Sequence, residues 1–252
     1  MQNLKYDVDI KQNITKMQAY YNEEIVPSEV KENYYEIRFY GDDFDCLFSD
    51  REYNEFLTYE LKDISIIKNK IKEIMPEGIL ISGGEPLLQR QTLLNIFNFC
   101  KKNKIKTGII TNASKPEVLG SLLKSGIVDT VIVDLKTGKD NFKKITKAGT
   151  FFKPTKEIYE DVLKSIRILK KYDQETEIIF RTTVIPGYVF RKETFIEIGK
   201  SIKDINAIWE LNKFIADEKS LFRNISPPSD NFMINLREIL EKEFDKIKVL
   251  ID

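Results

Sequence analysis

Short apolar runs alternate with helical segments along most of this 252-residue chain, and this alternation restricts the fold more than any other feature. In the helical segments, apolar residues recur every three or four positions. The strand-then-helix pattern repeats about six times, which predicts an α/β fold with a parallel sheet covered by helices. The six predicted strands lie near residues 34–40, 79–82, 105–111, 130–133, 177–184 and 207–214.

The two ends of the chain and one internal segment do not follow this repeat. Residues 1–31 have only weak patterning, and we expect them to form an N-terminal extension packed on the outside, with a short helix near residues 14–21. Residues 32–252 would form the α/β domain. Residues 137–154 predict a long loop, a feature that is usually functional or disordered. A last short strand is expected at residues 246–251.

The chain contains no histidine, which excludes any mechanism that needs an imidazole from this chain as base, acid or metal ligand. Its two cysteines, Cys46 and Cys100, are too few for a disulfide framework and too far apart for a paired metal-ligand spacing. We therefore expect a reducing, cytoplasmic compartment. Cys100 falls on the apolar face of a predicted helix, where the expected role is that of a small buried hydrophobe.

Charge and hydropathy predict neither a nucleic-acid partner nor a membrane partner. The chain has 40 lysine and arginine residues and 40 aspartate and glutamate residues, so no net field attracts a polyanion. No apolar run approaches the length that spans a membrane, and residues 1–10 lack the apolar core of a signal peptide. The lysines within residues 137–154 favour a loop that is simply exposed to solvent. The alternative is that this loop closes over an acidic partner.

Residues 79–89, with the sequence ILISGGEPLLQ, predict a binding turn. Gly83 and Gly84 let the backbone bend sharply and approach a ligand closely. Glu85 would offer two acceptor oxygens to a cationic group, and Pro86 suits the first turn of the helix that follows. In parallel sheets, ligands bind at the edge where the carboxyl ends of the strands meet. Further polar residues fall at or near that edge: Asn112, Asp134, Lys136 and Arg181.

These motifs resemble the radical S-adenosylmethionine (SAM) superfamily, and within it the activating proteins of anaerobic ribonucleotide reductase, a branch of the glycyl-radical activating enzymes. The resemblance covers about residues 34–252 and depends on SGGEP at 82–86, TN at 111–112, DLK at 134–136 and FRTTVIP at 180–186. It implies a partial (β/α)6 TIM-type barrel whose glycine turn holds the methionine amino group of SAM. The cofactor-binding residues that it implies are Ser82, Gly83, Gly84, Glu85, Asn112, Asp134, Lys136 and Arg181.

One part of the family pattern is missing. Radical SAM enzymes hold a 4Fe-4S cluster with three cysteines in a CxxxCxxC loop after the first strand. Residues 41–49 here read GDDFDCLFS, in which two aromatics, expected to be exposed, fix the register. Cys46 takes the place of the middle cysteine, and Asp42 and Ser49 occupy the other two positions. Such clusters are held by thiolates and occasionally by imidazole. We therefore expect neither a 4Fe-4S cluster nor reductive cleavage of SAM from this chain alone.

Three functions remain open at this point. The first is a cluster-less relative with a SAM- or nucleotide-sized pocket, which acts as a binding or regulatory partner of a radical enzyme or its activase. The second is a SAM- or nucleotide-dependent enzyme that uses polar chemistry at four residues, Glu85, Asp134, Lys136 and Arg181. A structural ion-pair network would account for these four residues equally well. The third is a radical SAM activase with an atypical cluster, held by Asp42, Cys46 and either Ser49 or a partner's thiolate.

Overall fold

An eight-stranded sheet organises the structure, a computed structural model that describes residues 17–48, 60–216, 222–244 and 247–251. The strand order is β10-β9-β8-β7-β6-β5-β3-β2, and every neighbouring pair is parallel except β2 and β3. The strands are β2 (Tyr21–Pro27), β3 (Tyr34–Phe39), β5 (Gly78–Gly83), β6 (Lys106–Thr111), β7 (Thr130–Asp134), β8 (Glu177–Val184), β9 (Ile208–Lys213) and β10 (Lys248–Ile251). The predicted α/β fold with a mostly parallel sheet is confirmed.

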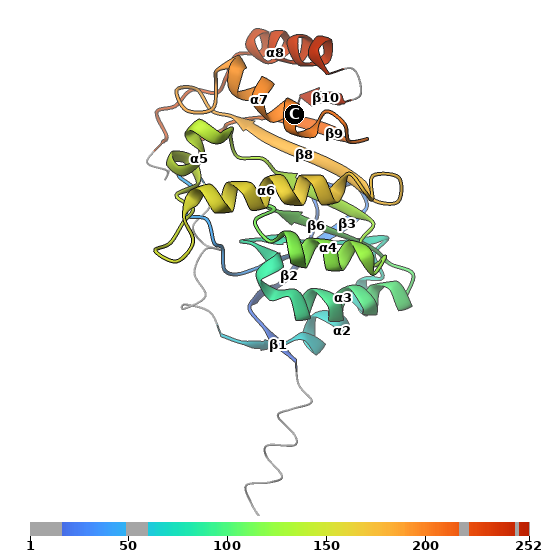
Figure 1. Cartoon of the computed structure of the whole chain (residues 1–252). Helices are drawn as coiled ribbons and strands as arrows, with labels where there is room; N and C mark the ends of the chain where they lie inside the picture. The colour runs from blue at the N-terminus through green and yellow to red at the C-terminus, as the bar shows by residue number, and fades with distance from the viewer. Residues whose placement is uncertain (1–16, 49–59, 217–221, 245–246, 252) are drawn as a thin grey trace, which may run out of the picture.

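The helices lie over one face of this sheet (Figure 1). They are α2 (Ile64–Ile74), α3 (Arg90–Lys102), α4 (Pro116–Lys124), α5 (Lys139–Thr146), α6 (Thr155–Leu169), α7 (Lys192–Ile202) and α8 (Asp230–Glu243). Alternate strand residues point to opposite faces, so Ile79 and Ile81 of β5 join the main core under the helices, whereas Leu80 joins a smaller cluster on the other face. The sheet is open, with β2 and β10 at opposite ends.

Short-range capping explains where several helices begin. Asp63 precedes α2, and its carboxylate accepts a hydrogen bond from the backbone N–H of Ser65 at 2.8 Å. Ser229 caps α8 in the same way, with its hydroxyl accepting from the N–H of Phe232 at 3.2 Å. Cys100 of α3 is fully buried in the core, as expected.

The predicted helix near residues 14–21 is wrong for the part that the structure describes. Residues 18–19 form the short strand β1 (Gln18–Ala19), which pairs with β4 (Lys62–Asp63), and β2 begins at Tyr21. Tyr21 is fully buried and pairs with Phe39 of β3. This cross-strand pairing stabilises the strand and is not visible in local sequence. The division of the chain at residue 31 stays a prediction, and β2, which precedes it, is part of the main sheet.

The predicted loop at residues 137–154 is also wrong, because α5 occupies its first half. Phe142 and Ile145 lie three positions apart, share one helix face and are buried in the core. Two apolar residues among several lysines give only a weak periodic signal. Residues 147–154 form the turn that leads into α6.

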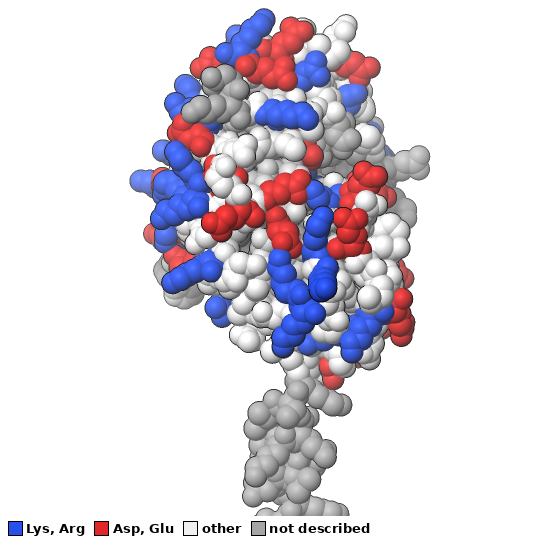
Figure 2. Space-filling model, turned by 90° about the vertical axis from the view of Figure 1, so that its right-hand side faces the viewer, with Lys and Arg blue, Asp and Glu red and all other residues white. Residues whose placement is uncertain are grey.

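The face at the amino ends of the parallel strands has interleaved charges of both signs (Figure 2). Ion pairs join Lys31 to Glu177 and Lys101 to Asp129, each at 2.5 Å, on this face. Both acids lie at or just before the start of a strand. No helix within the described ranges is long and apolar enough to cross a membrane.

Candidate functional site

The turn after β5 packs against the end of β3. Gly83 has a φ of +102°, and a Cβ atom there would lie 2.1 Å from the carbonyl oxygen of Phe39, so this position requires glycine. The N–H of Gly84 donates to the same carbonyl at 2.9 Å, and the N–H of Glu85 donates to the carbonyl of Gly41 at 2.7 Å. The sharp bend that the sequence predicts is therefore present, and the backbone that it approaches is the protein's own.

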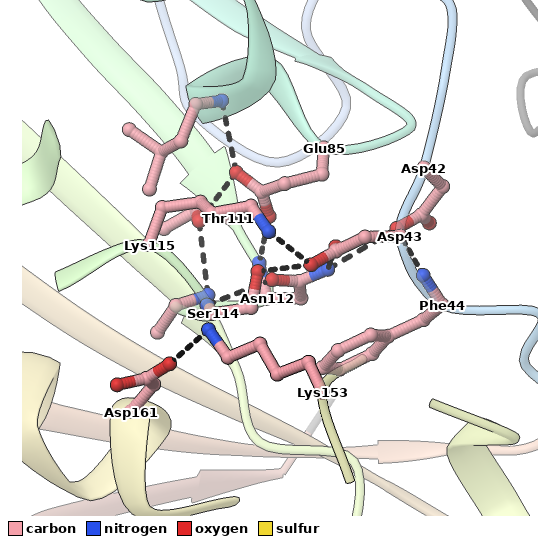
Figure 3. Close-up of polar contacts among 12 residues, drawn as sticks. Asp42, Asp43, Phe44, Glu85, Thr111, Asn112, Ser114, Lys115, Lys153 and Asp161 are labelled. Atoms are coloured by element: carbon pink, nitrogen blue, oxygen red, sulfur yellow. Dashed lines mark hydrogen bonds and ion pairs between the residues drawn. The ribbon is translucent and has the colours of Figure 1, made fainter. Parts of the chain in front are cut away.

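The carboxylate of Glu85 is fully buried and accepts hydrogen bonds from protein groups (Figure 3). One oxygen accepts from the N–H of Leu87 at 2.9 Å, the other accepts from the N–H of Asn112 at 2.7 Å, and the hydroxyl of Thr111 lies 2.8 and 2.9 Å from the two. Burial, reinforced by two neighbouring aspartates, raises the pKa of Glu85 to about 8. These hydrogen bonds show that both oxygens help to fix the turn, and a role of Glu85 in binding a cationic group stays a prediction.

Asp43 connects the loop after β3 to the loop after β6 (Figure 3). Its carboxylate accepts hydrogen bonds from the hydroxyl of Ser114 at 2.7 Å, from the ammonium group of Lys115 at 2.7 Å and from the side-chain amide of Asn112 at 2.9 Å. Burial works against ionisation, but these donors together lower the pKa of Asp43 below its usual value. The residue is thus an ionised anchor between two loops at the carboxyl edge of the sheet.

Of the two described residues at the expected cluster positions, Cys46 is buried and Asp42 is half-buried. Asp42 accepts from the N–H of Phe44 at 3.0 Å and from the side-chain amide of Asn112 at 3.1 Å, and burial raises its pKa to about 6. Burial likewise raises the pKa of the Cys46 thiol to about 11, so the thiol is neutral near pH 7. Ser49 lies outside the described residues.

The two aromatics of this loop are not exposed, contrary to expectation. Phe44 is 3% exposed and meets the ring of Phe142 of α5 edge-on, with the ring centroids 5.7 Å apart. Phe48 packs against Tyr188 and Phe214 at centroid distances of 4.9 and 5.3 Å. These contacts join residues that are far apart in the sequence, so the local polarity of the loop gave no indication of them.

Asp134, Lys136 and Arg181 come together, as the sequence predicts. Asp134 at the end of β7 pairs in register with Arg181 of β8. Its carboxylate accepts from the guanidinium of Arg181 at 2.7 and 2.8 Å and from the ammonium group of Lys136 at 3.1 Å. Burial alone would raise the pKa of Asp134, but the two cations lower it to about 2. The three groups form an ion-pair network with one excess positive charge.

A cavity of about 90 Å³ lies beside this network, and its lining includes Cys46, Phe48 and Thr183 as well as the three charged residues. A smaller neighbouring cavity of about 20 Å³ is lined by Asn112, Asp134 and Lys136 among others. Ligand pockets usually have a volume of about 300–1,000 Å³. The arrangement therefore has a cationic wall suited to an anionic group, but the cavity as it stands is small for a whole nucleotide.

Of the eight residues expected to bind the cofactor, four line the two cavities: Asn112, Asp134, Lys136 and Arg181. Three have side chains that hydrogen-bond within the fold, and Asn112 belongs to both groups. Ser82 is buried, and its hydroxyl donates to the carboxylate of Glu36, while Glu85 and Asn112 bond to the loops described above. Sequence reasoning did not identify Asp43 as an anchor between two loops. Its only signal was an acid in the loop after the predicted strand at residues 34–40.

An open, mostly parallel sheet with polar residues gathered at its carboxyl edge defines a partial α/β barrel with a candidate ligand site. The family model described as the radical SAM superfamily matches residues 43–199. The chain belongs to this superfamily.

Relatives and solved structures agree with this assignment. The chain is 30% identical over 187 residues to the "Putative glycyl-radical enzyme activating enzyme MJ1227" of Methanocaldococcus jannaschii, covering 73% of this chain and 74% of the relative. It is 29% identical over 132 residues to the pyruvate formate-lyase-activating enzyme of Clostridium pasteurianum, covering 52% of this chain but only 50% of that protein. Its fold is similar to that of Streptococcus suis SuiB bound to S-adenosylmethionine, with 17% identity, a TM-score of 0.59, and coverage of 84% of this chain and 48% of SuiB.

Proteins of this superfamily bind SAM and normally use a 4Fe-4S cluster, and the donor set of this chain does not fit the cluster. The whole chain has two cysteines and no histidine. Cys100 is buried in the core on α3, which leaves Cys46 as the one thiol near the site. Within the described residues, no group of three or more acidic or cysteine side chains is placed to hold a metal ion. The carboxylate of Asp42 is already bonded to protein donors.

Proposed function

We propose that this chain binds SAM, or a related adenosyl nucleotide, without cleaving it reductively on its own, and acts as a binding or regulatory partner of a glycyl-radical enzyme or its activase. The observation that supports this most directly is the contrast between the two halves of the site. The glycine turn keeps its conformation through Gly83 and the buried Glu85. The loop at the cluster position offers one neutral, buried thiol at Cys46.

The names of the relatives support the choice of partner. Several matches are activating enzymes of pyruvate formate-lyase or of 4-hydroxyphenylacetate decarboxylase. A chain of this lineage that has only one of the three thiolate ligands would retain the surface that meets the partner while losing the electron-transfer step.

Calorimetric titration tests the ligand half of the proposal. We expect SAM and S-adenosylhomocysteine to bind with similar affinity, because no iron chelates the amino and carboxylate groups of SAM. Gly83→Ala, in which a side chain would clash with the backbone of Phe39, is expected to abolish both. Gly126→Ala is the matched control, since Gly126 also has a positive φ but a Cβ atom added there would meet nothing within 4 Å. Silence of the wild type with both ligands would contradict the proposal.

Anaerobic reconstitution with iron and sulfide tests the cluster half. We expect the wild type to stay colourless and the Asp42→Cys/Ser49→Cys double variant, which restores three thiols at the family spacing, to develop thiolate-to-iron absorbance. A coloured wild-type protein with bound iron would contradict the proposal and favour an atypically held cluster.

Polar chemistry at the charged network is a weaker candidate. A general acid or base works best with a pKa near the working pH, whereas the pKa of Asp134 is lowered to about 2 and that of Lys136 is raised above its usual value, in spite of its burial, by Asp134. Glu85, with a pKa of about 8, is bonded within the turn. An assay for any product formed from SAM under air, with plausible co-substrates, would detect this activity.

A further inference from the structure

The turn between α5 and α6 presents the two most exposed large apolar side chains among the described residues. Phe151 is 94% exposed and Phe152 is 91% exposed, with their rings edge-on and the centroids 5.4 Å apart. The turn is fixed by its own hydrogen bonds: the N–H of Thr150 donates to the carbonyl of Lys153 at 2.9 Å, and the N–H of Lys153 donates to the hydroxyl of Thr150 at 3.1 Å. Adjacent exposed aromatics on an ordered turn are typical of an interaction surface.

The segment that contains this aromatic pair is rich in lysine. Residues 139–156 contain six lysines and one acidic residue, although the chain as a whole is balanced. Two of these lysines are paired, Lys147 with Asp45 at 3.4 Å and Lys153 with Asp161. Lys139, Lys143, Lys144 and Lys156 are exposed. A surface of this kind is complementary to a carboxylate-rich surface with an apolar pocket.

The α5 part of this segment lies beside the loop of the candidate site. The N–H of Leu47, in the loop after β3, donates to the carbonyl of Ile145 in α5 at 3.0 Å. The ammonium group of Lys144 lies 5.2 Å from the ring centroid of Tyr188, which itself packs on Phe48 of the same loop. In Figure 1, α5 and the turn before α6 lie at the left, at the end of the sheet opposite to the face in Figure 2. A molecule docked there would contact the loop that contains Asp42 and Cys46.

We propose that Phe151, Phe152 and the exposed lysines of residues 139–156 form a docking surface for an acidic region of a partner protein. The proposal deepens the proposed function by describing the partner's surface, and it relies on that function only for the partner's class, because docking here does not require SAM. A twofold contact between copies of this chain would place like charges opposite one another. The apolar residues of α5 are buried in the core, which leaves only two aromatics for insertion into a membrane.

Fluorescence anisotropy with the full chain tests the docking surface. The probes are a labelled glutamate-rich peptide with a leucine pair and its counterpart with glutamine in place of each glutamate. We expect the glutamate peptide to bind and the glutamine peptide to bind at least about tenfold more weakly. Phe151→Ser/Phe152→Ser should weaken binding of the glutamate peptide by at least about tenfold, since burial of about 60 Å² of ring surface accounts for that factor. Lys143→Glu/Lys144→Glu should weaken it similarly, and about 0.5 M salt should weaken wild-type binding.

Matched controls separate docking from folding and from cofactor binding. Met75→Ser and Lys171→Glu change an exposed apolar and an exposed basic residue outside this surface, and should leave peptide binding unchanged. The docking variants should keep the wild-type melting temperature and the wild-type SAM titration. A wild type that binds SAM but not the glutamate peptide would overturn only the docking surface. A wild type that binds the peptide but not SAM would overturn only the proposed ligand.

Three outcomes would overturn the docking proposal. The first is a wild type that does not bind the glutamate peptide, or a Phe151→Ser/Phe152→Ser variant that binds it as tightly as the wild type does. The second is sedimentation with phosphatidylserine–phosphatidylcholine vesicles that depends on Phe151 and Phe152, which would assign the surface to membranes. The third is concentration-dependent self-association that the same variant abolishes, which would assign it to a second copy of this chain.

Discussion

Replacement of Glu85 by glutamine tests whether this side chain fixes the turn after β5. One carboxylate oxygen accepts from the N–H of Leu87 at 2.9 Å and the other accepts from the N–H of Asn112 at 2.7 Å. A glutamine amide has only one acceptor oxygen, so in either orientation its NH2 group faces one of these two backbone donors. A buried donor without an acceptor costs about 1–3 kcal/mol. We expect the free energy of unfolding to fall by about that amount at acidic pH.

The pH dependence of this loss follows from the pKa of Glu85, which burial raises from 4.5 to about 8. Because the folded value lies above the unfolded value, the folded state holds the proton more tightly. The stabilisation is fully present below the unfolded pKa and is lost as the pH rises through the folded pKa. Wild-type stability should therefore fall between about pH 4.5 and pH 8, and the Glu85→Gln protein should lack that part of the slope. The gap between the two proteins should shrink as the pH rises.

Urea unfolding followed by tryptophan fluorescence measures both quantities, because the chain has one tryptophan, Trp209, and it is fully buried. Asp42, whose pKa is also raised, contributes a similar slope to both proteins and cancels in the difference. Glu160→Gln is the control, since Glu160 is exposed on α6. Equal stability of the wild type and Glu85→Gln near pH 5, or a gap that grows with pH, would refute the reasoning.

Three other substitutions probe the rest of the site. Gly83→Ala should lower the free energy of unfolding by more than about 3 kcal/mol, because backbone strain adds to a clash with a carbonyl oxygen, whereas Gly126→Ala should cost about 1 kcal/mol; equal losses in urea titrations would contradict this. Asp134→Asn should cost about 2–4 kcal/mol at neutral pH, since Arg181 loses its charged partner. Because the folded pKa of Asp134 is lowered to about 2, that deficit should disappear as the pH falls toward 2, and a constant deficit would count against it. Asp43→Asn should speed hydrogen exchange of the amides of residues 41–48 at least about tenfold, and unchanged exchange would show that Asp43 does not anchor the loop.

The elements that the sequence predicted well are those whose signal is local. The strands that begin at Tyr34 and Glu177 have dense β-forming residues, and α2 has isoleucines at helical spacing. The meeting of Asp134 and Arg181 follows from parallel strands whose carboxyl ends share one edge. The sequence did not show whether a side chain at this edge faces a ligand site or bonds to the rest of the chain. Glu85 and Asn112 were placed correctly at the edge, yet they bond to the chain itself.

The elements that were predicted wrongly depend on distant contacts. The strand β2 exists because Tyr21 and Ile25 pair with β3, and α5 exists because Phe142 and Ile145 pack into the core. Phe44 is buried by Phe142, almost a hundred positions along the chain. No window of local sequence contains these partners, so propensity alone could not identify them.

The glycine turn is present in a chain that lacks two of the expected cysteines, and there are two physical explanations. Either SAM binding requires the turn or the fold itself requires it, and the contacts bear on the second. The turn itself is required by the fold: Gly83 passes against the carbonyl of Phe39, and Glu85 satisfies backbone donors on η2 (Pro86–Gln89) and after β6. A chain that no longer bound SAM would therefore still need these residues for its fold. Asp43 anchors the loop after β3 through hydrogen bonds from Ser114 and Lys115. The motif by itself is thus evidence of ancestry and of a stable edge, and it is the response of the wild type to SAM that separates a working pocket from a structural remnant.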